Sequence, residues 1–104
     1  MSERISKTKN YCILLLKNGP NRHMAGAEKI TWEHGRRNFA LLGSGVMPIV
    51  CPVADGSDLC GIGIFNKNGD EVKIIMDDDP GVKEGIFIYE IHPCRGFPGS
   101  SLPS

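Results

Sequence analysis

The order of the apolar segments constrains the fold of this chain more than any other feature. Strands are expected at residues 11–16, 46–53, 59–65 and 85–92, and helices at residues 25–42 and 70–77. The first segment, Tyr-Cys-Ile-Leu-Leu-Leu, is continuously apolar, as is typical of a strand that is covered on both faces. The longer helical segment contains no proline and ends before Gly-Ser-Gly, which is a helix stop signal. The order strand-helix-strand-strand-helix-strand predicts an α+β, ferredoxin-like fold, with a four-stranded antiparallel sheet and both helices on one face.

Prolines and glycines refine two of these strands. Pro48 and Pro52 remove two hydrogen-bond donors from the second strand, so we expect it at an edge of the sheet. In the third strand, Gly61 and Gly63 alternate with apolar residues. One face of that strand therefore has almost no side chains, which allows a helix, a ligand or another backbone to approach closely.

The length of the chain bears on where a binding site can form. With 104 residues, the chain is expected to be one domain, 1–104, whose termini at residues 1–9 and 97–104 are flexible. A chain this short has one modest core and little room for a cavity of its own. Because no element remains to cover the second face of the sheet, we expect a homodimer or higher homo-oligomer, with a cavity between the subunits.

Charge and composition exclude several classes of partner. Twelve basic and twelve acidic residues give no net charge, so the basic surface that nucleic-acid binding requires is not expected. The apolar runs are too short to span a membrane, and the first ten residues do not resemble a secretion signal, so a cytoplasmic location is expected. No phosphate-binding glycine loop and no nucleophile motif is present, and we expect no cofactor.

The four cysteines, Cys12, Cys51, Cys60 and Cys94, include no CxxC pair. Free thiols are therefore favoured over disulfides or a structural zinc site. His92 and Cys94 lie two residues apart at the end of the last strand, a spacing compatible with one face, but a metal site would need further ligands. No metal is expected.

His34 is the first candidate for chemistry. Helical periodicity places it on one face with Ala27, Ile30 and Leu41, whereas Trp32 and Phe39 lie on nearly the opposite face. One interpretation is a core histidine that is bound to a backbone carbonyl. The other is a general acid or base that is held by a carboxylate.

Three consecutive carboxylates, Asp77, Asp78 and Asp79, supply candidate partners for His34. Such a run is often a solvated helix end. Asp79 stands directly before Pro80, in a rigid turn that fixes its direction. A carboxylate there could accept the imidazole N–H and fix the tautomer of the ring. Arg37 and Asn38, which follow His34 on the helix, are candidates for binding substrate, although a helical arginine is also typical of a solvated flank.

The chain resembles the YCII-related family of the dimeric α/β-barrel superfamily over roughly residues 11–96. The features that carry the resemblance are the first strand, His34 followed by Phe39 and Leu42 on a glycine-ended helix, and Asp79-Pro80 followed by Gly85 and the last strand. The chain departs from the family in one place. Gly43-Ser44-Gly45-Val46-Met47-Pro48 stands where a Gly-Pro dipeptide usually follows the first helix.

The resemblance implies a dimeric α/β barrel and an active-site pair of histidine and aspartate, which carries over to His34 and Asp79. It also implies a small organic substrate. A His/Asp pair alone can drive proton transfer, so we expect an isomerase-like or lyase-like enzyme whose pair lies in a dimer cavity. The alternative is a non-catalytic module that binds a small ligand or mediates dimerisation, with a structural histidine.

Overall fold

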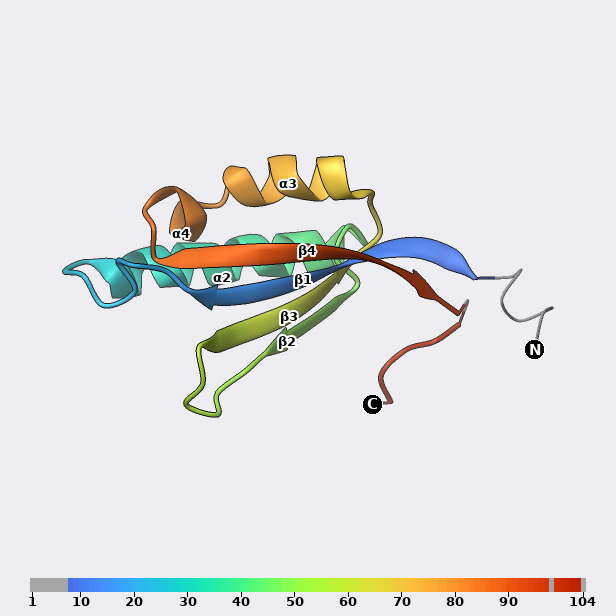
Figure 1. Ribbon diagram of the computed structural model, residues 1–104, viewed down its shortest axis with the longest axis horizontal. Helices are drawn as coiled ribbons and strands as arrows, with labels where there is room; N and C mark the ends of the chain where they lie inside the picture. Colours follow the sequence, from blue (N-terminus) through green and yellow to red (C-terminus); the bar gives the residue numbers. More distant parts are fainter. Residues whose placement is uncertain (1–7, 98, 104) are drawn as a thin grey trace.

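The computed structural model describes residues 8–97 and 99–103, and it confirms the expected α+β fold (Figure 1). In chain order the elements are β1 (Lys9–Asn18), α2 (Ala27–Gly43), β2 (Ile49–Pro52), β3 (Leu59–Phe65), α3 (Gly69–Asp77), α4 (Pro80–Lys83) and β4 (Phe87–Gly96). The strands form one sheet in the order β2-β3-β1-β4, and every neighbouring pair is antiparallel. This is the ferredoxin-like order, in which β1 lies beside β3 and β4.

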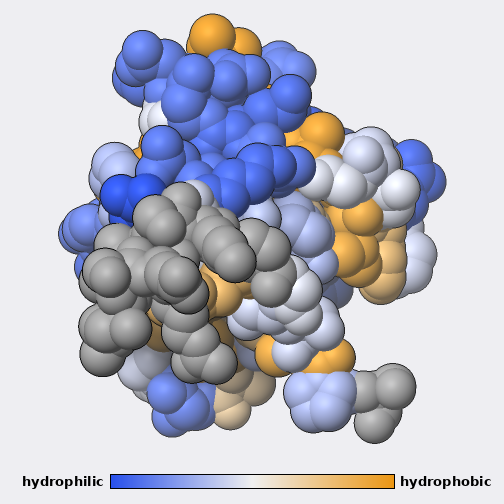
Figure 2. All heavy atoms as spheres, turned by 90° about the vertical axis from the view of Figure 1, so that its right-hand side faces the viewer, coloured by the Kyte–Doolittle hydropathy of each residue, from blue (hydrophilic) through white to orange (hydrophobic). Residues whose placement is uncertain are grey.

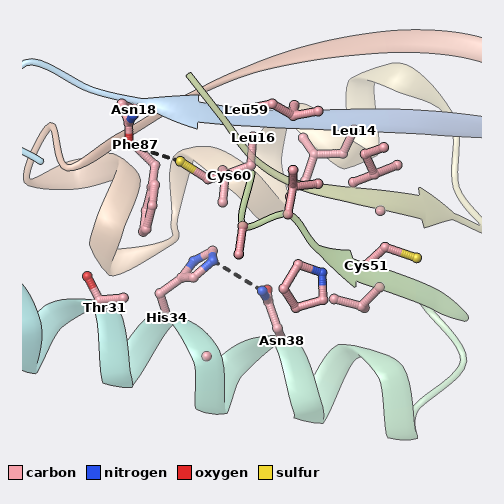
Figure 3. A pocket seen from close by; sticks show the side chains of 18 of the residues that line it. Leu14, Leu16, Asn18, Thr31, His34, Asn38, Cys51, Leu59, Cys60 and Phe87 are labelled. Carbon is pink, nitrogen blue, oxygen red and sulfur yellow. Dashed lines mark hydrogen bonds between the residues drawn. The ribbon is translucent and has the colours of Figure 1, made fainter. Parts of the chain in front are cut away.

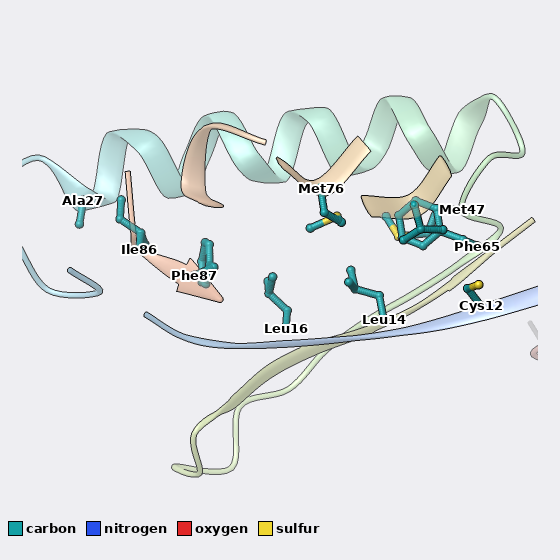
Figure 4. Packing of buried hydrophobic residues seen from close by; sticks show 10 residues of the cluster. Cys12, Leu14, Leu16, Ala27, Met47, Phe65, Met76, Ile86 and Phe87 are labelled. Carbon is teal, nitrogen blue, oxygen red and sulfur yellow. The ribbon is translucent and has the colours of Figure 1, made fainter. Parts of the chain in front are cut away.

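The core lies between the sheet and the helices on one face only. Alternate residues of β1, Cys12, Leu14 and Leu16, are buried, and they cluster with Ala27 of α2 and Met76 of α3 (Figure 4). Side chains alternate between the two faces of a strand, so the intervening β1 residues point away from the helices. Both long helices therefore cover the same face, and within the described residues no helix covers the other.

The expected boundaries of three strands, β1, β2 and β4, need correction. β1 begins at Lys9, inside the segment expected to be a flexible terminus, because Lys9 pairs with Gly96 across the sheet. β2 is shorter than expected and spans Ile49–Pro52, although its edge position is confirmed. Residues 1–7, 98 and 104 of the expected flexible termini lie outside the described residues.

β4 begins at Phe87, later than expected, and the loose tail expected after Pro93 begins later as well. The strand continues through Pro93 to Gly96. β4 lies at an edge of the described sheet and pairs with β1 on one side. Pro93, opposite Cys12, has no N–H group, but at an edge there is no second strand that this missing donor would deprive of a hydrogen bond.

A short helix, α4, follows α3 where only a rigid turn was expected. Its first residue is Pro80, whose fixed backbone angle suits the first helical position, and the side chain of Asp79 caps it. Four residues with a proline in the first position carry no helical periodicity, which explains why the sequence pattern did not reveal it. α4 nevertheless determines the direction of Asp79.

The surface agrees with the balanced charge of the sequence. Figure 2 shows the end of the molecule near both termini, where the coloured atoms are mostly hydrophilic and the hydrophobic ones form small separate patches. Trp32 and Phe39 on the outer face of α2 are 69% and 76% exposed, so that face has no partner within the described residues. In the described part of the chain, no helix combines the length and apolar character that a membrane span requires.

Candidate active site

A cavity of about 480 Å³ lies inside the single chain, between α2 and the sheet (Figure 3). Its size is within the range of small-molecule sites. The helix contributes Thr31, His34 and Asn38, β1 contributes Leu14 and Leu16, and further lining residues come from β2, β3 and the loop between them. The single chain thus forms an open cleft between helix and sheet, and the expected cavity between subunits stays a prediction.

Two glycines of β3 make this cavity possible. Gly61 and Gly63 pair with Leu16 and Leu14 of β1, so they belong to the face that α2 covers. A Cβ on Gly63 would lie 2.6 Å from Sδ of Met47, so the side chain of Met47 already occupies the space beside Gly63. A Cβ on Gly61 would be 3.5 Å from the carbonyl oxygen of Cys51, an ordinary contact. Gly61 therefore leaves open space that a side chain could occupy, as expected from the bare face of this strand.

We predict that Gly61→Val blocks the cavity while the fold persists. A valine has no close backbone contact to overcome at this position, and it suits a strand. Its methyl groups would occupy the space between β3 and α2. Ligand affinity, measured by titration calorimetry, should fall at least about tenfold, and the thermal midpoint should stay within a few degrees of that of the matched control Gly69→Ala, at the start of α3 and outside the cavity lining. Unchanged affinity would mean that ligands bind elsewhere.

His34 and Asp79 meet in the structure although 45 positions separate them. Nδ1 of His34 lies 2.9 Å and 2.8 Å from the two carboxylate oxygens of Asp79. Asp79 is fully buried and His34 is 6% exposed. The ring of His34 also packs against Phe87, with 4.7 Å between the ring centroids. The contact of His34 with Asp79 agrees with the pairing suggested by the sequence and strengthened by the family resemblance.

The start of α4 holds the carboxylate of Asp79 in place. The same oxygen that is 2.8 Å from His34 accepts hydrogen bonds from the backbone N–H groups of Gly81 (2.9 Å) and Val82 (3.3 Å). Burial by itself would raise the pKa of Asp79, but the hydrogen bonds from His34 and Val82 and the positive charge of Arg37 outweigh it. The pKa of Asp79 is therefore lower than its usual value, and the carboxylate is ionised at neutral pH.

The second ring nitrogen of His34 faces the cavity (Figure 3). Nδ2 of Asn38 lies 3.1 Å from Nε2 and donates a hydrogen bond to it. A carboxylate at Nδ1 and an amide donor at Nε2 are compatible with the tautomer that has its proton on Nδ1. The one lone pair of Nε2 accepts the hydrogen bond of Asn38, so this amide must give way to a substrate before Nε2 can act as a general base.

The other predicted site residues are placed differently. Asn38 lines the cavity, whereas Arg37 lies outside its lining and pairs with Asp79 (3.5 Å) and Asp78 (3.8 Å). His92 is 4.0 Å from Glu90. Among the described residues no group of three or more potential metal ligands occurs, and all four cysteines are free thiols.

Comparison with known proteins supports the fold. No family model and no curated protein matches the chain. A solved structure is similar to it: 5-chloro-2-hydroxyhydroquinone dehydrochlorinase from Burkholderia phenoliruptrix, in complex with 2,5-dihydroxybenzoquinone. The likeness covers 79% of this chain and 90% of that one, with a TM-score of 0.52 and 19% sequence identity. At this identity the likeness shows a shared fold.

Two lining residues were not anticipated from the sequence. Arg22 belongs to the turn between β1 and α2, and Thr31 lies one helical turn before His34. Periodicity could have placed Thr31 beside His34, since residues three apart share a helix face. Nothing in the local sequence marks Arg22, because its position depends on contacts between this turn and the residues that precede β4.

Proposed function

We propose that this protein is a small-molecule enzyme that moves a proton on an organic substrate, with His34 as the general base and Asp79 as the residue that orients it. The observation that carries the proposal is the double contact of Nδ1 with the buried carboxylate, together with a cavity on the Nε2 side. Asp79 holds the ring in one tautomer and stabilises the imidazolium that forms when Nε2 accepts a proton. Asn38 and Arg37 are the proposed substrate-binding and supporting residues.

The reaction class follows from this chemistry. A substrate whose C–H group is acidified by a neighbouring carbonyl or hydroxyl group would give its proton to Nε2. The electron pair left on carbon can then expel a leaving group on the adjacent carbon, which is an elimination, or take back a proton at another position, which is an isomerisation. The structural neighbour named as a dehydrochlorinase of a hydroxylated ring compound makes a lyase-like reaction on a cyclic substrate a reasonable first test.

The proposal is tested by proton exchange in D₂O. Cyclic ketones, hydroxyquinols and 5-chloro-2-hydroxyhydroquinone would be incubated with the protein, and loss of C–H signals would be followed by NMR together with chloride release. We expect at least one compound to exchange or eliminate faster with protein than without it. Binding of these compounds without any exchange would favour the alternative function, a non-catalytic ligand-binding module in which the His34–Asp79 pair only stabilises the fold.

We also propose that the chain belongs with the YCII-related proteins, acts in the cytoplasm and forms a homodimer through the open face of its sheet. Support for the dimer comes from the side chains that β1 and β3 direct away from the helices. Cross-strand pairing places Ile13 beside Ile64 and Leu15 beside Ile62 on that face. A dimer should appear in sedimentation velocity at micromolar concentration, and Leu15→Lys should shift it to the monomer. A wild-type monomer at these concentrations would contradict the proposed assembly.

A further inference from the structure

The cavity carries a single permanent charge. Among its described lining residues there is one arginine, Arg22, and there is no aspartate or glutamate. His34 is the other basic group, and Asp79, behind it, is outside the lining. A cavity with a fixed cation and no acid favours an anionic ligand over a neutral or cationic one.

No carboxylate pairs with Arg22 among the described residues, and the ring of Phe87 is the group that its guanidinium contacts. Arg37, in contrast, pairs with Asp78 and Asp79. The guanidinium of Arg22 lies 5.2 Å from the centroid of the Phe87 ring, and its Nε is buried without a hydrogen bond in the described structure. A buried donor without an acceptor costs free energy unless a ligand or a water molecule fills the place.

The position of Arg22 is held by the backbone. Its turn is joined to the segment before β4 by hydrogen bonds from the N–H of Gly19 to Ile86 (2.8 Å) and from the N–H of Asn21 to Gly85 (2.9 Å). A side-chain bond from Asn21 to the carbonyl of Glu84 (2.9 Å) adds to them. The arginine is therefore presented beside Phe87 by a fixed turn, which lowers the entropy cost of binding an anion.

A second unsatisfied group lies on the helix. Oγ1 of Thr31 is buried, lines the same cavity region and has no hydrogen-bond partner in the described structure. Phe87 and Gly61 also line this cavity, so apolar and backbone surface accompanies the two polar groups.

We propose that the cavity binds a small organic anion, with a carboxylate or enolate-type oxygen held by the guanidinium of Arg22. Arg22 is then the residue that selects the charge of the ligand, and His34 is the residue that would act on it. The proposal shares its cavity with the proposed function but does not depend on catalysis. An anion could bind at Arg22 even if His34 transferred no proton.

The test uses benzoate and benzamide, which are similar in shape and differ in charge. Titration calorimetry should show that the wild-type protein binds benzoate at least about tenfold more tightly than benzamide, as expected for a charge-assisted hydrogen bond in a partly buried site. Arg22→Gln should remove this preference. The matched control is Arg36→Gln, an exposed arginine on α2 outside the cavity lining, which should retain it. Equal binding of the two probes to the wild type, or a preference that survives Arg22→Gln, would overturn the proposal.

Histidine ring signals in NMR spectra show where benzoate binds. Arg22 also borders a second hollow at the start of α2, and His23 lines that hollow. Benzoate should shift the ring signals of His34 and leave those of His23 and His92 unchanged. Shifts at His23 alone would place the anion in the second hollow and reject the cavity assignment. If the wild-type protein prefers benzoate through Arg22 but exchanges no substrate protons, the anion site is retained and the proposed catalysis is rejected.

Discussion

Replacing Asp79 with alanine is expected to lower the free energy of unfolding by about 3–5 kcal/mol, the usual cost of removing one partner of a buried pair. The substitution leaves the Nδ1–H group of His34 buried without its acceptor, and it removes the cap from α4. Small domains are often stable by only about 5–15 kcal/mol, so this is a large fraction of the total. Urea denaturation followed by tryptophan fluorescence measures it. A loss below about 1 kcal/mol would show that the pair contributes little to the fold.

Asp79→Asn separates the structural role of this residue from its chemical one. Asparagine has the same shape and can still cap α4 through its side-chain oxygen. The oxygen that caps α4 lies 2.8 Å from Nδ1 and can still accept its N–H, but the NH₂ group that replaces the other oxygen removes the negative charge, so the imidazolium that forms at His34 loses its stabilisation. In a Ser-His-Asp triad the equivalent change lowers kcat about 10⁴-fold. We expect a comparable loss of proton exchange in a folded protein, with benzoate binding retained.

The lowered pKa of Asp79 also predicts how stability depends on pH. Its carboxyl group binds a proton less readily in the folded protein than in the unfolded chain. The stability it provides is therefore fully present above its unfolded pKa, about 3.9, and is lost as the pH falls through its lower folded value. Between pH 5 and pH 2, Asp79→Asn should lose less stability than the wild type. Asp78→Asn should change the profile less, because the hydrogen bond from Lys83 lowers the pKa of Asp78 at an exposed position, where solvent screens the interaction.

Helices and strands could be predicted from the sequence where the local residue pattern and the position of the segment in the sheet favour the same structure. The alternation of Gly61 and Gly63 with apolar residues predicted both the third strand and its bare face, and the strand spans Leu59–Phe65 as expected. The pattern failed at Pro93, because a proline marks the end of a strand unless the strand lies at a sheet edge, and edge position is a property of the whole sheet. The short α4 had no periodicity from which it could be predicted.

Some residues of the candidate site could also be predicted from the local sequence, and others could not. His34 was found from its helix face, and Asp79 was singled out as its candidate partner by the proline that follows it; the family resemblance strengthened the pairing, but a separation of 45 positions hides the contact from the local sequence. The cleft beneath α2 agrees with the bare face expected for the third strand, where Gly61 leaves open space, and the cavity expected between subunits stays a prediction. Arg22 could not be found from the sequence, since the hydrogen bonds that bring its turn to Phe87 join residues more than 60 positions apart.

His34→Gln is expected to abolish proton transfer while the cavity keeps its shape. Glutamine is close to histidine in size, and its NH₂ group can still donate to Asp79, but it cannot accept a proton from carbon at neutral pH. Removal of a general base typically costs about 10²–10⁴-fold in rate, and exchange of the active compound in D₂O, followed by NMR, measures it.

The matched control for this variant is His92→Gln on β4, which is outside the cavity lining and should exchange at the wild-type rate. Benzoate affinity separates loss of the base from loss of the site, because Arg22 is untouched in both variants. If His34→Gln still exchanges substrate protons as fast as the wild type, another group is the base and the proposed mechanism is wrong. If exchange is lost and benzoate binding stays within about twofold, the loss belongs to the chemical step, because binding and catalysis then depend on different residues of one cavity.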